Sequence, residues 1–162
     1  MCSKHHRSIL RLLLFLSFPA VFSLALTTVQ AEQLPIKTYT TADGLADDRI
    51  NRIVQDSHGF LWFCTAEGLS HFDGYKFTNY TRANGMPNDF VTDLMEARDG
   101  TYLVGTQGGG LLQFNPKGSP LFTPLNHPVL SRESINQLLA DRAGNIWCGT
   151  GAGLYRLDRG SS

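Results

Sequence analysis

Three stretches of the chain repeat one alternation of apolar and polar positions, over residues 56–73, 97–115 and 141–158. In each stretch a glycine follows polar residues, and about five apolar, β-favouring residues come next. A second glycine turn and a short alternating segment complete the stretch. Each copy therefore predicts two strands joined by tight turns.

The copies share a glycine before the first strand, a large apolar residue in its middle and a threonine at its end. These positions are Gly59, Gly100 and Gly144, then Trp62, Leu103 and Trp147, then Thr65, Thr106 and Thr150, with Gly68 opening the second turn of the first copy. The aligned glycines are 41 and then 44 residues apart. A nearly constant period indicates a repeat architecture. A tryptophan in mid-strand is expected to pack between neighbouring sheets.

Further strands are predicted on both sides of each copy. A matched apolar pair precedes each copy: Ile50 and Ile53, Val91 and Leu94, and Ile135 and Leu138. Aromatic or apolar segments follow the first two copies, at residues 77–80 and 121–125. Four strands in about forty residues are typical of a β-propeller blade. Helical repeats share this period, but glycines and aromatics interrupt any helical stripe about every ten residues. We therefore predict an all-β fold, a partial β-propeller of about three four-stranded blades, over residues 44–80, 85–125 and 130–158.

The ends of this pattern predict an incomplete propeller over residues 32–162. Residues 35–40 match the outer strand at 77–80 but have no blade of their own, so an N-terminal orphan strand is expected there. The third copy stops at Asp158, before an outer strand. Because rings usually contain four to eight blades, we expect the open ends to associate with downstream blades or with a second copy of the chain.

Residues 1–31 have the pattern of a secretory signal peptide. Basic residues precede an apolar run over residues 9–26, and Val29-Gln30-Ala31 forms a small-residue cleavage pattern. This pattern predicts cleavage after Ala31 and export to the periplasm. An uncleaved membrane anchor is the alternative, because the run nearly reaches the length of a membrane span.

The charge of the chain argues against nucleic-acid binding, and its cysteine positions argue against a disulfide. Of 14 Lys and Arg residues, three (Lys4, Arg7 and Arg11) lie in the predicted signal peptide, so 11 basic residues face 14 acidic ones in the rest. A mildly acidic chain without a basic stripe is a poor candidate for nucleic-acid binding. Cys64 and Cys148 lie a whole predicted blade apart, beyond the ~7 Å limit for a disulfide, so two buried free thiols are expected.

The motif over residues 40–77 is TTADGLADDRINRIVQDSHGFLWFCTAEGLSHFDGYKF. It resembles the two-component regulator propeller repeat; the other copies are looser, with Leu103 in place of Trp and Asn115 in place of Asp. The resemblance extends over about residues 35–158. It implies the extracytoplasmic, seven-bladed sensor propeller of a bacterial receptor anchored in the inner membrane. A histidine kinase or diguanylate cyclase output is implied downstream, so no catalytic residue carries over to this chain.

Catalytic, phosphate and metal motifs find little support. The glycine runs at 105–110 and 149–153 lack the Lys and the helix of a P-loop. The spacing of His58, His71 and His127 with nearby acids fits no zinc or calcium pattern, so we expect surface residues. No paired acid/base set repeats between copies. We therefore expect no enzyme activity, metal or cofactor in this chain.

Candidate ligand contacts are sought in loops, because loops on a rigid scaffold carry recognition. Two equivalent turns are expected to face one rim of the channel, and their candidates are Asp47, Asp48, Arg49, Asn88 and Asp89. The leading hypothesis is a sensor module for a small-molecule or glycan ligand. A streptogramin-lyase-like enzyme is a second hypothesis, disfavoured because no histidine occupies equivalent positions in two copies. A protein–protein scaffold is the third.

Overall fold

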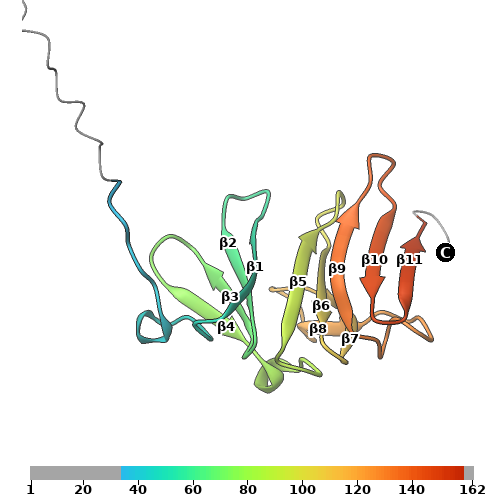
Figure 1. The fold of residues 1–162 in the computed structure, drawn as a ribbon, viewed down its shortest axis with the longest axis horizontal. Helices are drawn as coiled ribbons and strands as arrows, with labels where there is room; N and C mark the ends of the chain where they lie inside the picture. The colour runs from blue at the N-terminus through green and yellow to red at the C-terminus, as the bar shows by residue number, and fades with distance from the viewer. Residues whose placement is uncertain (1–33, 159–162) are drawn as a thin grey trace, which may run out of the picture. The chain divides into compact units, whose positions relative to one another are not determined.

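The computed structural model describes residues 34–158, and all of their helices and strands lie in the unit that begins at Thr38. The predicted signal peptide lies outside the described residues. No helix of the described part is long and apolar enough to cross a membrane. Figure 1 shows the strands of the unit arranged as three antiparallel sheets.

Each sheet is a simple antiparallel meander. The first contains β1 (Ile50–Gln55), β2 (Leu61–Thr65), β3 (Leu69–Phe72) and β4 (Phe77–Tyr80) in that order. The second contains β5 (Val91–Glu96), β6 (Tyr102–Thr106), β7 (Gly110–Phe114) and β8 (Phe122–Pro124). The third contains β9 (Ile135–Ala140), β10 (Ile146–Thr150) and β11 (Gly153–Leu157). The all-β partial propeller is confirmed, with three strands in the third sheet.

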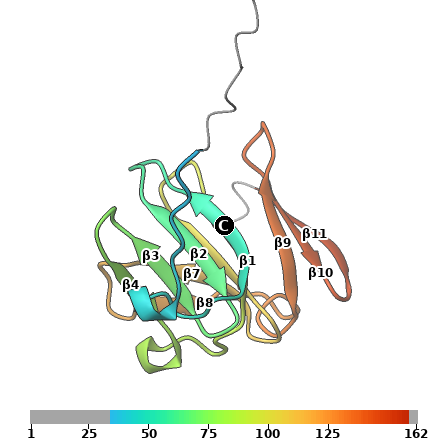
Figure 2. The ribbon, with the colours of Figure 1, turned by 60° about the vertical axis from the view of Figure 1, so that its left-hand side comes forward.

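The first strands of the three sheets, β1, β5 and β9, lie side by side (Figures 1 and 2). A register shift recurs in each of them, after Ile50, after Val91 and after Ile135. A register shift of this kind is a β-bulge, which changes the direction of one side chain relative to the regular alternation of the strand. In the first two strands the re-aimed side chain reaches the next sheet: Asn51 Nδ2 donates to the Val91 carbonyl at 2.8 Å, and Thr92 Oγ1 donates to the Ile135 carbonyl at 2.5 Å.

Alternating side chains of the second sheet fill two cores. Tyr102 and Val104 of β6 face the first sheet, where they pack with Trp62. Leu103, between them, faces the third sheet and packs with Ile135. The exposed fractions of Trp62 and Leu103 are 2% and 3%, which confirms the predicted burial of Trp62 between sheets.

Trp147 departs from the prediction that the mid-strand tryptophan is buried. It is half-buried, and the Arg156 guanidinium lies 5.6 Å from its ring. Leu139 and Leu154 lie on the same face of the third sheet and are 62% and 68% exposed. The face is open because no further sheet of the described residues covers it.

The repeated threonines close the second turn of each copy. The Oγ1 atoms of Thr65, Thr106 and Thr150 donate to the carbonyls of Gly68, Gly110 and Gly153 at 2.8, 3.0 and 2.9 Å. In the first and third turns the same oxygen also accepts a backbone N–H. These hydrogen bonds, one donated in every turn and a second accepted in two of them, give a physical reason for threonine at the end of each central strand.

Two smaller predictions concern residues 35–40 and the cysteines. None of the three sheets takes up residues 35–40, so the expected orphan strand, which needs a partner from outside these sheets, stays a prediction. The two cysteines are free and buried, as predicted, and each lies in a different core. Burial raises the pKa of the Cys148 thiol to about 11 and raises that of Cys64 further.

Gly110 supplies a sharp test of how the second sheet meets the connection that leads to the third sheet. A Cβ at this position would lie 2.5 Å from the carbonyl oxygen of Leu130, whereas a Cβ at Gly108 would meet nothing within 4 Å. Both glycines have positive φ, 79° and 71°, so the backbone strain of an alanine is similar at the two sites. We expect Gly110→Ala to lower the free energy of unfolding by about 1–3 kcal/mol more than Gly108→Ala in urea titrations. Equal losses would contradict the close approach.

Candidate functional site

Five loop residues were predicted from the sequence as ligand contacts. In the structure, they make hydrogen bonds and contacts that hold two equivalent loops in place. Asp48 accepts the Thr41 N–H at 2.7 Å at the start of η1 (Thr41–Asp43). Asp89 accepts the Arg82 N–H at 2.6 Å at the start of η2 (Arg82–Asn84). The expected equivalence of the two turns is therefore confirmed.

The other three candidates also make local contacts. Asp47 accepts the Arg49 N–H at 3.1 Å, and Asn88 accepts the Phe90 N–H at 2.9 Å. Arg49 joins the two loops, since its guanidinium lies 5.2 Å from the centre of the Phe90 ring. A ligand role for these five residues stays a prediction.

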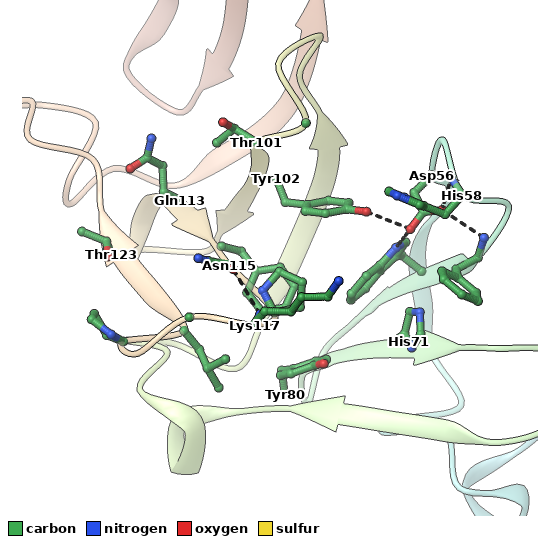
Figure 3. A pocket seen from close by; sticks show the side chains of 18 of the residues that line it. Asp56, His58, His71, Tyr80, Thr101, Tyr102, Gln113, Asn115, Lys117 and Thr123 are labelled. Atoms are coloured by element: carbon green, nitrogen blue, oxygen red, sulfur yellow. Dashed lines mark hydrogen bonds between the residues drawn. The ribbon is translucent and has the colours of Figure 1, made fainter.

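A cleft of about 830 Å³ opens between the first and second sheets. One wall comes from β2, β3 and β4, and the other comes from β6, β7 and the irregular loop that follows β7 (Figure 3). A volume of this size is in the usual range for small-molecule sites. We take this cleft as the candidate functional site.

Asp56 is the polar centre of the cleft. Its Oδ2 accepts hydrogen bonds from Trp62 Nε1 and from the Tyr102 hydroxyl, each at 2.9 Å, so the carboxylate joins the two sheets. Its Oδ1 accepts the N–H groups of His58 and Phe60 at 2.9 and 3.0 Å. Burial raises the pKa of this carboxyl, but these four donors outweigh burial and hold the pKa below its ordinary value.

The Asp–Trp pair is present in two repeats and absent in one. In the third sheet Asp141 accepts a hydrogen bond from Trp147 Nε1 at 3.1 Å, and its pKa falls to about 2 because of that bond and the bonds from Asn145. The second repeat has Ala97 and Leu103 at the two positions, and its turn keeps the backbone hydrogen bonds between Ala97 and Thr101 and between Gly100 and Ala97. The pair was not among the residues predicted from the sequence. Its signal was available, because the acid and the indole occur together or not at all.

His71 lies beside this pair in the first sheet. Its ring centre is 4.4 Å from that of Trp62 and 5.0 Å from that of Phe60. Burial lowers the pKa of His71, while the carboxylates of Asp56 and Asp73 act in the opposite direction. The lowered pKa favours the neutral imidazole near pH 7.

The loop after β7 forms the opposite wall. Asn115 Oδ1 accepts the Lys117 N–H at 3.1 Å, and the Gly118 N–H donates to the Asn115 carbonyl at 3.0 Å. A Cβ at Gly118 would lie 2.6 Å from the Asn115 amide nitrogen, so the turn fits glycine closely. This turn begins the stretch after β7 that contains Pro116, Pro120, Pro124 and Pro128. Figure 3 shows the exposed Lys117 side chain extending from it toward the side of Tyr80 and His71.

Metal-binding geometry is not found among residues 34–158, where no group of three or more His, Cys, Asp or Glu side chains is placed to hold an ion. His58 and His71 both line the cleft, together with Asp56. His127 accepts the N–H groups of Val129 and Leu130 on its Nδ1 at 3.3 and 3.2 Å, in the connection between the second and third sheets.

Comparison with known proteins identifies the repeat and the fold. The family model described as "Two component regulator propeller" matches residues 44–67. The extracellular domain of the putative hybrid two component system BT3049 from B. thetaiotaomicron is 25% identical over 74% of this chain, with a TM-score of 0.62. That of the putative one component system BT4673 from B. thetaiotaomicron is 23% identical over 77%, with a TM-score of 0.61.

A third solved structure shares the fold alone. It is PorZ, a surface component of the type-IX secretion system of Porphyromonas gingivalis, with 23% identity over 82% of this chain and a TM-score of 0.52. No curated protein matches this chain. The chain spans 17% of each B. thetaiotaomicron domain and 21% of PorZ. Residues 44–67 therefore match the two-component regulator propeller repeat, and the three sheets follow the pattern of that repeat.

Proposed function

We propose that this chain is a ligand-sensing propeller module of a bacterial two-component signal-transduction receptor, and that it is not catalytic itself. The observation that carries the proposal is its likeness to the extracellular domain of a putative hybrid two component system, at 25% identity and a TM-score of 0.62. The match of residues 44–67 to the two-component regulator propeller supports the same assignment.

The cleft between the first two sheets suits a sensing role. Its walls come from two sheets that are joined by the hydrogen bonds of Asp56 to Trp62 and Tyr102. A ligand that contacts both walls stabilises the arrangement of the sheets that fits it best, and such differential binding is what a sensor transmits. The neighbouring loop is the non-repeating one, which fits a recognition role on a repeated scaffold.

Variation at one position of the repeat favours binding over the lyase-like alternative. The residue paired across the strands with Trp62, Leu103 and Trp147 is His71, Gln113 and Arg156, respectively. A histidine or acid projecting from several blades is the arrangement that a lyase-type site needs. Here the position changes from imidazole to amide to guanidinium, which suits one specific binding site better than a shared catalytic set.

We further propose that the module is exported to the periplasm and belongs to a receptor anchored in the inner membrane. The predicted signal peptide and the extracellular placement of the two similar domains support this location. The open face of the third sheet, with Trp147, Leu139 and Leu154, would be covered by a further blade or by a second copy of the chain.

An in-frame deletion tests the proposed function in the cell. The codons for residues 34–158 are removed from the chromosomal gene with the reading frame kept, and transcripts are compared with the parent across single-nutrient media. A sensor module predicts that a defined set of transcripts loses its response to one nutrient class. Transcription that stays unchanged in every medium, with a product missing from the culture instead, would contradict sensing and favour an enzyme.

A further inference from the structure

The polar atoms of the cleft between the first two sheets divide into engaged acceptors and available donors. Both oxygens of Asp56 are occupied by four donors, and Asp99 Oδ1 accepts the Thr101 N–H at 3.0 Å. The acidic groups of the cleft are therefore committed to holding the protein together. They offer little to a ligand that presents hydrogen-bond donors.

The available polar groups are mainly donors. Within the described part of the chain, no hydrogen bond or ion pair holds the side chains of His71, Tyr80 or Lys117, all of which line the cleft. Figure 3 shows His71 and Tyr80 along one side, with Lys117 extending toward that side from the loop. A lysine ammonium supplies three donors and no acceptor. An imidazole and a phenol can each supply one more.

An apolar surface borders these donors. Phe60 is 39% exposed, and its ring stands edge-on to His71 at 5.0 Å. Behind them lie Trp62 and Phe114, with ring centres 5.6 Å apart. A flat or puckered ring resting on this surface places its substituents beside His71 and within the side of the cleft that Lys117 extends toward.

From this inventory we propose that the cleft binds a ring-bearing organic acid, with its carboxylate held by Lys117 and His71 and its ring against Phe60. The inference names the ligand class of the proposed sensing function and rests on that function. The volume of about 830 Å³ leaves room for one or two rings. An acid supplies the acceptors that the cleft lacks, and a charge-assisted bond to the ammonium is among the stronger hydrogen bonds available.

The site should also respond to acidity. The charged or titratable groups around His71 are Asp56 and Asp73 on its own sheet, His58 on the turn above β2, and Asp99 and Lys117 on the second sheet's side. Since burial lowers the pKa of His71, its imidazole becomes a second positive group only in mildly acidic solution. An anion held beside the imidazole favours the charged form, so affinity should rise as pH falls from neutrality.

Equilibrium dialysis of the full exported chain tests the proposal, because the method tolerates any oligomeric state. The probes are D-glucuronate and benzoate as ring acids, D-glucose and benzyl alcohol as their uncharged counterparts, and acetate as an acid without a ring. We expect at least one ring acid to bind about tenfold more tightly than its uncharged counterpart and than acetate. Glucuronate alone would identify the source as a sugar acid, and benzoate alone as an aromatic acid; both results support the proposal.

Matched variants assign the binding to the named residues. Lys117→Gln should weaken ring-acid binding about tenfold, whereas Lys76→Gln, in the turn between β3 and β4, should leave it unchanged. His71→Gln should abolish the gain in affinity between neutral and mildly acidic pH. The proposal is overturned if neither ring acid binds, if the uncharged probes or acetate bind equally well, or if Lys76→Gln is as damaging as Lys117→Gln. The in-frame deletion can contradict the sensing role whatever the dialysis shows, and the dialysis can contradict the ligand class while the sensing role stands. The two proposals are therefore tested separately.

Discussion

Replacing Trp62 with alanine is expected to lower the free energy of unfolding by about 3–5 kcal/mol, as deletion of a large buried ring does. The side chain is 2% exposed, and its ring centre lies 5.5 Å from that of Tyr102 and 5.6 Å from that of Phe114. The change leaves a cavity between two sheets and removes a donor from the buried Asp56. Urea titration followed by far-UV circular dichroism measures the loss, and a variant as stable as the parent contradicts the packing.

The second repeat provides a control for this prediction. Asp56→Ala alone removes the acceptor of Trp62 Nε1 and the Tyr102 hydroxyl, which should cost about 1–3 kcal/mol. Combining it with Trp62→Leu reproduces the Ala97 and Leu103 pairing of the second repeat. We expect the double variant to lose less free energy of unfolding than the sum of the losses of Asp56→Ala and Trp62→Leu measured singly. Strict additivity would show that the acid and the indole do not act as a pair.

Asp93→Ala is expected to have the next largest effect, a loss of about 3 kcal/mol in the free energy of unfolding, because one side chain serves all three sheets. Asp93 is 2% exposed; its Oδ2 accepts the Leu138 N–H of β9 at 2.8 Å, and Arg52 Nε of β1 lies 3.3 Å from Oδ1. Removing the carboxylate leaves the Leu138 N–H buried without a partner. Arg52→Gln is the control and should cost less, since Arg52 is about half exposed.

The effect of Asp93 should depend on pH. Burial raises the pKa of this carboxyl, and the bonds from Leu138 and Leu94 and the charge of Arg52 only partly oppose the rise. A carboxyl whose pKa is higher in the folded chain stabilises the fold most below about pH 4, the unfolded value, and the benefit declines as pH rises through the folded value. The loss caused by Asp93→Ala should therefore be larger at pH 4 than at pH 7. A larger loss at pH 7 would mean that the ion pair with Arg52 outweighs burial.

The strands were predictable because glycine turns and two-residue alternation recur at nearly constant spacing. All eleven strands of residues 34–158 lie where the repeat places them, including the strands predicted from the apolar pair before each copy. The segment at 35–40 matched an outer strand in pattern, yet it has no ladder because pattern alone supplies no partner. Burial of Trp147 was overestimated for a similar reason, since the repeat does not say whether a neighbouring sheet covers the position.

The candidate site was less predictable than the fold. Asp47, Asp48, Asn88 and Asp89 looked available for a ligand in the sequence, but each accepts a backbone N–H of its own loop. The cleft depends on the turn at Asn115 and Gly118, whose geometry is not part of the repeat. Loops were the expected place for recognition, and the loop after β7 does line the cleft.

The first two repeats pack face to face as neighbouring blades, and the cleft exists only in this arrangement. Nuclear Overhauser contacts of the Trp62 indole ring in the full chain test this most directly. We predict contacts to ring protons of Tyr102 and Phe114, which are 40 and 52 residues away in sequence and belong to the second sheet. Contacts confined to residues of the first sheet, such as His71 and Tyr80, would contradict the packing and with it the cleft.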